Sequence, residues 1–122
     1  MTTAEVGKKL VELCSQGRND LAVEQLYAPT IVSVEGFETH GMPRVTNGIA
    51  AVAAKGKWWV DNHEVHSAKV YDLCSSMEKF AVVFDYDVTF KPKNERQNLH
   101  EIAVYTVENG KIVHEEFMYA GM

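Results

Sequence analysis

The chain has 122 residues, of which 46% are hydrophobic and 24% charged, and its formal net charge is -5. This length and composition fit one globular domain and exclude an intrinsically disordered chain. The Lys and Arg residues are scattered, without the basic stripe that nucleic-acid binding needs. No apolar run approaches the ~20 residues of a membrane span, and the N-terminus lacks the pattern of a secretory signal. We therefore expect a single cytoplasmic domain over residues 1–122, with no nucleic acid or membrane as partner.

The cysteines and histidines favour neither a disulfide nor a metal site. Cys14 and Cys74 are far apart and lie in apolar segments, so free buried thiols are expected. His63 and His66 are three residues apart in an expected strand, where alternation sends them to opposite faces. Because no cysteine or carboxylate spacing completes a tetrahedral set, we predict no metal site and no cofactor.

Two helices are expected at the start of the chain. Thr2 and Glu5 have the spacing of a capping box, and apolar residues then recur at helical intervals. A second helix is expected with Asn19 or Asp20 as its N-cap. Pro29 lacks a backbone donor and clashes with a continuing helical turn, so the chain must change direction there.

A strand, a loop and a third helix follow. Residues 31–35 predict a short β-branched strand that ends in a carboxylate, and the glycine-containing segment 36–47 predicts a loop long enough to cover a site. Asn47 is the expected N-cap of the third helix, in which Trp59 flanks the buried face and Trp58 points the opposite way. The expected buried face consists of Ile49, Val52, Ala53, Gly56 and Val60.

From residue 63 onward the pattern is that of strands. Three β-rich stretches follow, and an Asn-Gly turn at 109–110 splits the last into two, which gives a meander of four strands. Clean alternation in the middle stretch predicts an inward face formed by Val82, Phe84, Tyr86, Val88 and Phe90. The element order predicts an α+β domain in which three N-terminal helices pack on the concave face of a curved antiparallel sheet around a cavity.

The element order and three segments resemble the SnoaL-like family of the nuclear transport factor 2-like superfamily. The segments are LYAP at 26–29, NGIAAVAAKGKWW at 47–59 and VYTVENGKIVHEEFMYA at 104–120. The resemblance implies a cone-like fold with a ligand-binding pocket and a homodimer formed through the outer face of the sheet. It specifies no reaction, because relatives include isomerases, cyclases, dehydratases, hydrolases and non-catalytic binding modules.

The ketosteroid isomerases are more distantly similar. Along LYAPTIVSVE, Glu35 falls where that family keeps its catalytic base. The family's tyrosine position in the first helix holds Leu10, and the position of its protonated acid falls at or near Ala103, whose face Glu101 shares. The resemblance therefore implies one carboxylate in a related cavity rather than the steroid reaction itself.

Glu35 is the leading catalytic candidate. A carboxylate that loses hydration beside Val34 and Phe37 would hold its proton to higher pH and could shuttle protons near neutrality. The alternative is a solvated acid at a strand end. Tyr86, or His63 at the junction of the third helix and the sheet, would stabilise the developing negative charge. The expected substrate-binding residues are Phe37, Trp59, Phe84, Glu101, Phe117 and Tyr119.

Three hypotheses follow from the sequence. The first is a cofactor-independent acid–base enzyme, of isomerase, cyclase, dehydratase or hydrolase type, acting on a small and largely apolar organic substrate. The second is a non-catalytic ligand-binding or dimeric interaction module with the same pocket. The third is a structural dimer whose hollow is filled by side chains.

Overall fold

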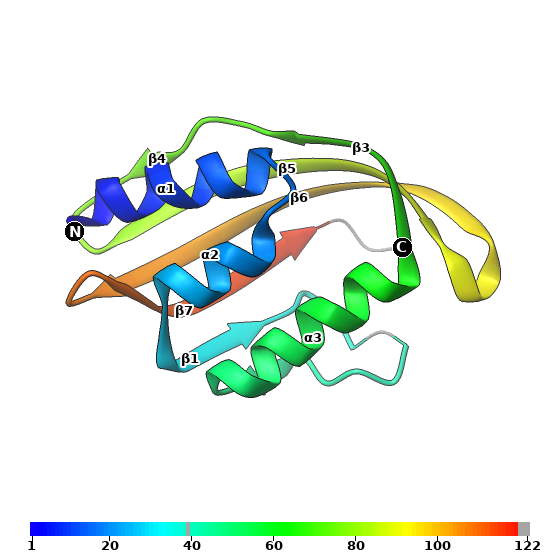
Figure 1. Cartoon of the computed structure of the whole chain (residues 1–122), viewed down its shortest axis with the longest axis horizontal. Coiled ribbons are helices and arrows are strands. Elements are labelled where there is room, and N and C mark those ends of the chain that lie inside the picture. The colour runs from blue at the N-terminus through cyan, green and yellow to red at the C-terminus, as the bar shows by residue number, and fades with distance from the viewer. Residues whose placement is uncertain (39, 120–122) are drawn as a thin grey trace.

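The computed structural model describes residues 1–38 and 40–119 of the chain. Its helices are α1 (Thr3–Ser15), α2 (Asn19–Leu26), α3 (Ile49–Asn62) and the short 3-10 helix η1 (Lys91–Lys93). Its strands are β1 (Tyr27–Val34), β2 (Val45–Asn47), β3 (His63–Val70), β4 (Cys74–Ser75), β5 (Lys79–Phe90), β6 (Glu95–Glu108) and β7 (Lys111–Tyr119). The three α-helices lie across one face of a curved sheet (Figure 1), which confirms the predicted α+β arrangement.

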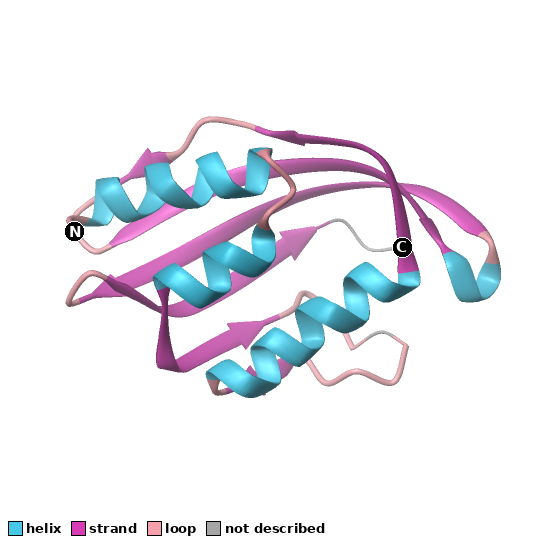
Figure 2. Ribbon diagram, in the orientation of Figure 1, coloured by secondary structure: helices cyan, strands magenta, loops and turns pink. Residues whose placement is uncertain are grey.

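The sheet has seven strands in the order β2-β1-β7-β6-β5-β3, with β4 paired to β5 (Figure 2). Every neighbouring pair is antiparallel except β1 and β7, which run parallel. The sheet is therefore mixed rather than wholly antiparallel. Since β1 and β7 are joined by a long stretch of chain and not by a hairpin, no tight turn imposes an antiparallel pairing on them.

The start of α1 is as predicted and the start of α2 is not. The Thr2 hydroxyl accepts from the Glu5 backbone N–H at 3.2 Å, and the Glu5 carboxylate accepts from the Thr2 N–H at 2.8 Å. Helix α2 has Arg18 at its N-cap and no side-chain cap, so the predicted capping role of Asn19 or Asp20 is wrong. The Asp20 carboxylate accepts instead from the Arg18 guanidinium at 3.2 Å.

Strand β1 begins at Tyr27, earlier than the sequence predicts. Pro29 lies inside this strand, in the stretch between Tyr27 and Val32 where the register against β7 shifts. An irregular stretch tolerates proline because the missing N–H is not needed for a regular ladder. Helix α2 thus ends at Leu26 without direct termination by Pro29.

The segment predicted as a loop over 36–47 contains strand β2 at its end. Asn47 pairs with Val32 of β1, so it cannot serve as the N-cap of α3. Gly48 occupies that position with φ +88°, a backbone conformation that favours glycine. The predicted lid is therefore shorter and partly held to the sheet.

Helix α3 presents a different face to the sheet from the one predicted. Val52 is buried as expected, but Val60 is 63% exposed. Lys55 is turned inward instead, and both Trp58 and Trp59 are half-buried. The prediction is wrong because the many alanines give this helix only a weak periodic pattern, and because Lys55 finds polar partners inside.

The inward face of β5 is as predicted: Val82, Phe84, Val88 and Phe90 are buried and Tyr86 is partly buried. Asn109 and Gly110, both with positive φ, form the predicted hairpin turn between β6 and β7. Both cysteines are free thiols. Cys14 is buried as predicted, whereas Cys74 is exposed in β4, too short a strand to cover it. No helix among residues 1–38 and 40–119 is long and apolar enough to cross a membrane.

Candidate functional site

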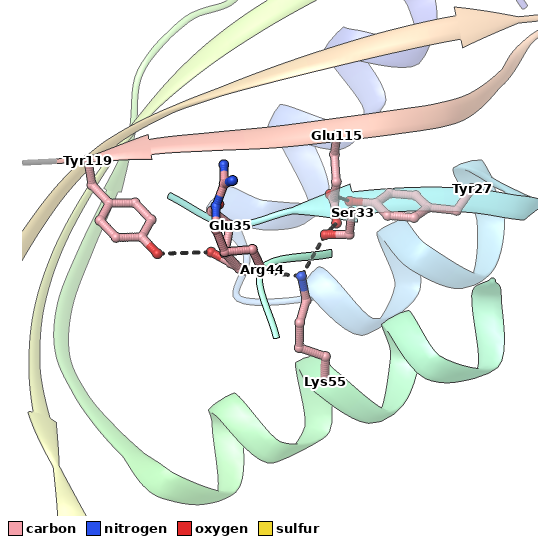
Figure 3. A network of polar contacts seen from close by, with 7 residues as sticks. All are labelled: Tyr27, Ser33, Glu35, Arg44, Lys55, Glu115 and Tyr119. Atoms are coloured by element: carbon pink, nitrogen blue, oxygen red, sulfur yellow. Dashed lines mark hydrogen bonds and ion pairs between the residues drawn. The ribbon is translucent and has the colours of Figure 1, made fainter. Parts of the chain in front are cut away.

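The site is built where β1 ends, between β7 and α3 (Figure 3). Ser33 of β1 pairs with Glu115 of β7 across the parallel ladder, so their side chains share the inner face. The backbone of Glu35 is fixed by Arg44: its N–H donates to the Arg44 carbonyl at 2.8 Å, and its carbonyl accepts from Arg44 Nε at 3.1 Å. These contacts hold the Glu35 side chain at the edge of the concave face.

The Glu35 carboxylate accepts hydrogen bonds from two side chains. Oε1 accepts from Lys55 Nζ at 3.1 Å, and Oε2 accepts from the Tyr119 hydroxyl at 3.3 Å. The side chains of Glu35 and Lys55 are 28% and 14% exposed. The expectation of apolar surroundings for Glu35 is therefore wrong, because an ammonium and a phenol replace much of its lost hydration while water still reaches it.

A second, buried branch extends from Lys55 into the core. Its Nζ also donates to Ser33 Oγ at 2.6 Å, and Ser33 donates to Glu115 Oε2 at 2.7 Å. The Tyr27 hydroxyl donates to the other Glu115 oxygen. Burial raises the pKa of the Glu115 carboxyl, although the hydrogen bonds from Tyr27 and Ser33 oppose that rise.

Sequence reasoning did not identify Tyr27, Ser33, Lys55 or Glu115. For Glu115 a signal was present, because strand alternation puts it on the same face as Phe117 and Tyr119. For Lys55 there was no such signal, since a lysine on an amphipathic helix is normally solvated.

Glu101 lies on the inner face of β6, directly between Phe84 of β5 and Tyr119 of β7 in the sheet register. Burial raises the pKa of Glu101 to about 7, helped by the negative charges of Glu35 and Glu115 and opposed by Lys55. The predicted position of Glu101 on the inner face is confirmed. Its carboxyl can exchange a proton near neutral pH.

His63 and Tyr86 belong to a neighbouring aromatic group. The His63 ring stacks on Trp59 at 4.2 Å between centroids, and its Nδ1 is bonded to the Trp59 carbonyl at 2.8 Å. Burial lowers the pKa of His63 and raises that of the Tyr86 hydroxyl. Among the described residues, neither side chain is hydrogen-bonded to Glu35, and their catalytic roles stay predictions.

Aromatic rings border the acidic group on two sides. Phe37 packs edge-on against Tyr119 with centroids 5.3 Å apart, and Lys55 Nζ lies 5.7 Å from the centre of the Phe117 ring. Farther along the concave face, Phe84 stacks on Tyr86 and Tyr86 contacts Trp59. The predicted substrate-binding residues thus fall into two adjacent clusters, one beside Glu35 and one beside His63.

A hollow of about 370 Å³ lies over β3, β5 and β6, away from Glu35. Tyr86 lines it together with polar residues such as Asp85 and Asp87. No three His, Cys, Asp or Glu side chains in the described part of the chain are grouped to hold a metal ion.

Three helices on the concave side of a bent mixed sheet form the same fold as an Anabaena variabilis protein described as NTF2-like, which is 12% identical with a TM-score of 0.75, covering 98% of this chain and 90% of its own. Residues 1–119 match the model of the SnoaL-like domain, and the chain belongs to the SnoaL-like family. A search of curated proteins gives no match.

Solved structures of similar proteins agree with this assignment. A Mesorhizobium loti protein, described provisionally as a SnoaL-like polyketide cyclase and also as a carbohydrate phosphatase, is 42% identical with a TM-score of 0.92, covering 98% of this chain and 100% of its own. A provisionally named isomerase from Bacillus subtilis is 17% identical with a TM-score of 0.76, covering 97% and 86%. A Xanthomonas campestris protein of unknown function with a cystatin-like fold is 15% identical with a TM-score of 0.80, covering 99% and 92%. The last two show the fold alone.

Proposed function

We propose that this SnoaL-like protein is a cofactor-independent acid–base enzyme that acts on a small, largely apolar organic molecule. The observation that carries the proposal is the Glu35 carboxylate, which is partly exposed and held by Lys55 and Tyr119 on a face that also bears Glu101. Lys55 of α3 and Tyr119 of β7 both donate to this carboxylate, whereas a fully solvated acid would be bonded to water. The aromatic rings around it suit an apolar substrate.

The two carboxyl groups suit opposite roles. Glu35 is partly exposed and held by hydrogen bonds from an ammonium and a phenol, so a substrate can reach it and it is the proton acceptor. Glu101, whose pKa is about 7, retains a proton in a large fraction of molecules at neutral pH and is the proton donor. Two carboxyl groups in different surroundings commonly divide acid and base roles in this way.

The cyclase name given to the 42% identical M. loti protein supports proton transfer as the reaction class. Ring closure of a polyketide begins with removal of a proton from carbon beside a carbonyl, and many isomerisations begin with the same step. We therefore expect proton abstraction next to a carbonyl group. His63 and Tyr86 would then contact the more distant part of the substrate.

Deuterium exchange tests this function with model ketones in place of the natural substrate. The protein is incubated in D₂O with a panel of uncharged ketones, and loss of the C–H signals beside the carbonyl is followed by proton NMR. We expect faster exchange in at least one ketone, and a decrease of roughly 10²–10⁴-fold in Glu35→Gln. Glu24→Gln, at an exposed position of α2, is the control and should exchange at the original rate.

Exchange that persists in Glu35→Gln would exclude Glu35 as the base. If no ketone exchanges but a ligand copurifies with the protein, the binding-module hypothesis replaces the enzymatic one. Mass spectrometry of the purified protein checks for such a ligand.

We also propose a homodimer through the outer face of the sheet. Ile102 and Met118 are cross-strand neighbours there and are 39% and 48% exposed, an apolar patch that a second copy would cover. Sedimentation should give a dimer for the unmodified protein and a monomer for Ile102→Glu. The single-domain organisation and the cytoplasmic location stay predictions.

A further inference from the structure

The Lys55 ammonium has one hydrogen-bond donor more than its contacts use. An ammonium carries three N–H groups. One donates to Ser33 and one to Glu35, and no described residue accepts the third. The ammonium lies beside the Phe117 ring, on the same side of the sheet as the Tyr119 hydroxyl (Figure 3). A further acceptor from a bound molecule can therefore approach it.

The position of Lys55 is fixed from the buried side. Ser33, which accepts from the ammonium, donates in turn to Glu115, and Glu115 also accepts from Tyr27. Ser33 and Glu115 are 0% and 3% exposed, so this branch is shielded from water. A donor held in place before the reaction stabilises new charge at little reorganisation cost.

Charge balance connects Lys55 to the proposed reaction. At the start, the ammonium is the counter-ion of the Glu35 carboxylate at 3.1 Å. When Glu35 takes a proton from the substrate, its negative charge is lost and an equal charge appears on the substrate. The positive charge of Lys55 can then pair with the negative charge on the substrate, as it paired before with the negative charge of Glu35.

We propose that Lys55 is a catalytic residue that exchanges its ion pair with Glu35 for one with the oxygen of an uncharged carbonyl substrate while Glu35 removes a proton from the adjacent carbon. The inference rests on the proposed function and adds the substrate class and the oxyanion-binding group. Ser33 and Glu115 are positioning residues, because they act through Lys55.

The step is balanced in atoms and electrons. The substrate C–H bond breaks and its proton forms an O–H bond on Glu35. The released electron pair forms a C=C bond, and the carbonyl π pair moves onto oxygen. Lys55 keeps its three protons and donates a hydrogen bond to that oxygen.

Other titratable groups also face this ammonium. The Glu115 carboxyl on β7 is connected to the ammonium by hydrogen bonds through Ser33, and the Glu101 carboxyl on β6 interacts with it electrostatically. While Glu101 is protonated it adds no negative charge that would compete with the substrate oxygen. Lys55 can therefore exchange Glu35 for the substrate oxygen without a further counter-ion.

Benzoate and benzamide test the proposal, since they have nearly the same shape and differ in charge. Benzoate resembles the anion formed in the reaction and competes with the Glu35 carboxylate for Lys55, whereas benzamide carries no charge. In calorimetry at a single pH, Glu35→Gln should therefore bind benzoate at least about tenfold more tightly than the unmodified protein does. Benzamide should bind both proteins equally well.

Two lysine variants separate the role of Lys55 from general charge. Lys55→Met should abolish the preference for benzoate over benzamide, a loss of at least about tenfold for a partly buried ion pair. Lys57→Met is the matched control, because Lys57 lies on the same helix but is 77% exposed and paired with Asp61. That control should retain the preference.

Ser33→Ala keeps the proposal testable if Lys55→Met fails to fold. It preserves every charge and removes one contact of the ammonium, so benzoate binding should weaken severalfold while benzamide binding stays the same. The Lys55 ammonium signal in nitrogen-15 NMR should also broaden, because its protons exchange faster with water.

The outcomes distinguish this inference from the proposed function. If Glu35→Gln abolishes ketone exchange while Lys55→Met binds benzoate as before, the acid–base function stands and the role of Lys55 is overturned. If benzoate binding depends on Lys55 but the unmodified protein exchanges no ketone, the catalytic role of Lys55 is also overturned, together with the proposed function.

Discussion

Replacement of Glu101 by glutamine tests whether this carboxyl is as strongly perturbed as its position indicates. Glu101 lies between Phe84 and Tyr119, and burial raises its pKa from the ordinary 4.5 to about 7. Glutamine has nearly the same shape and cannot ionise. The difference in the free energy of unfolding between the two proteins therefore measures how the ionisation of Glu101 affects stability.

The sign of the effect follows from the two pKa values. Below about pH 4.5 both the folded and the unfolded chain hold the proton, and ionisation affects neither. Between 4.5 and 7 the unfolded chain loses the proton while the folded chain keeps it, so stability falls as pH rises. At about 1.4 kcal/mol per unit of pKa, the loss is about 3 kcal/mol once the pH exceeds 7.

Urea unfolding of both proteins at several pH values from 4.5 to 8 measures this difference. We expect Glu101→Gln to gain about 3 kcal/mol relative to the unmodified protein across that range, or roughly 10 °C in Tm for a domain of this size. Glu24→Gln, whose side chain is exposed on α2, controls for loss of one negative charge. Parallel stability curves for Glu101→Gln and the unmodified protein would refute the assignment of Glu101 as the proton donor.

Two further predictions concern stability. Tyr27→Phe removes a donor to the buried Glu115 carboxyl and should cost about 1–3 kcal/mol in urea unfolding, and no change would mean that Tyr27 does not satisfy this acid. Gly110→Ala should cost about 1–2 kcal/mol, because Gly110 has φ +75° and a Cβ there would lie 3.2 Å from the Met1 backbone. Gly56→Ala, in open space within α3, should instead stabilise by up to about 1 kcal/mol, which makes the pair a test of backbone geometry.

The predictions from sequence succeeded where a local pattern of residues is regular and unbroken. Strand β5 alternates without a break, so its inward residues could be assigned from spacing alone. The Asn-Gly turn at 109–110 was equally clear, because few residues adopt positive φ at low cost. Both features reflect local chemistry that does not depend on the rest of the fold.

The predictions failed where tertiary contacts decide. The parallel pairing of β1 with β7 joins segments far apart in the chain, and no local pattern specifies its direction. The rotation of α3 depends on Lys55 reaching Ser33 and Glu35, partners that only the folded sheet brings together. The buried position of Glu115 depends in turn on the hydroxyl groups of Tyr27 and Ser33.

The outcome for Glu35 shows why a correct residue can be identified for an incomplete reason. Its position at the end of β1 followed from the strand, but the proposed apolar surroundings did not. What makes it a candidate base is the pair of donors, Lys55 and Tyr119, at an edge that water still reaches.

One series of hydrogen bonds runs from a fixed, buried end at Glu115 to a reactive, partly exposed end at Glu35. At the buried end, Glu115 has both oxygens occupied by hydroxyl groups, so exchanging a partner there would leave an unsatisfied charge in the core. At the open end, Glu35 is partly hydrated and can change its charge at lower cost. Lys55 belongs to both ends, and its hydrogen bond to Ser33 fixes the ammonium while its bond to Glu35 remains exchangeable. A proton arriving at Glu35 should therefore release Lys55 toward a substrate oxygen without disturbing the core that positions it.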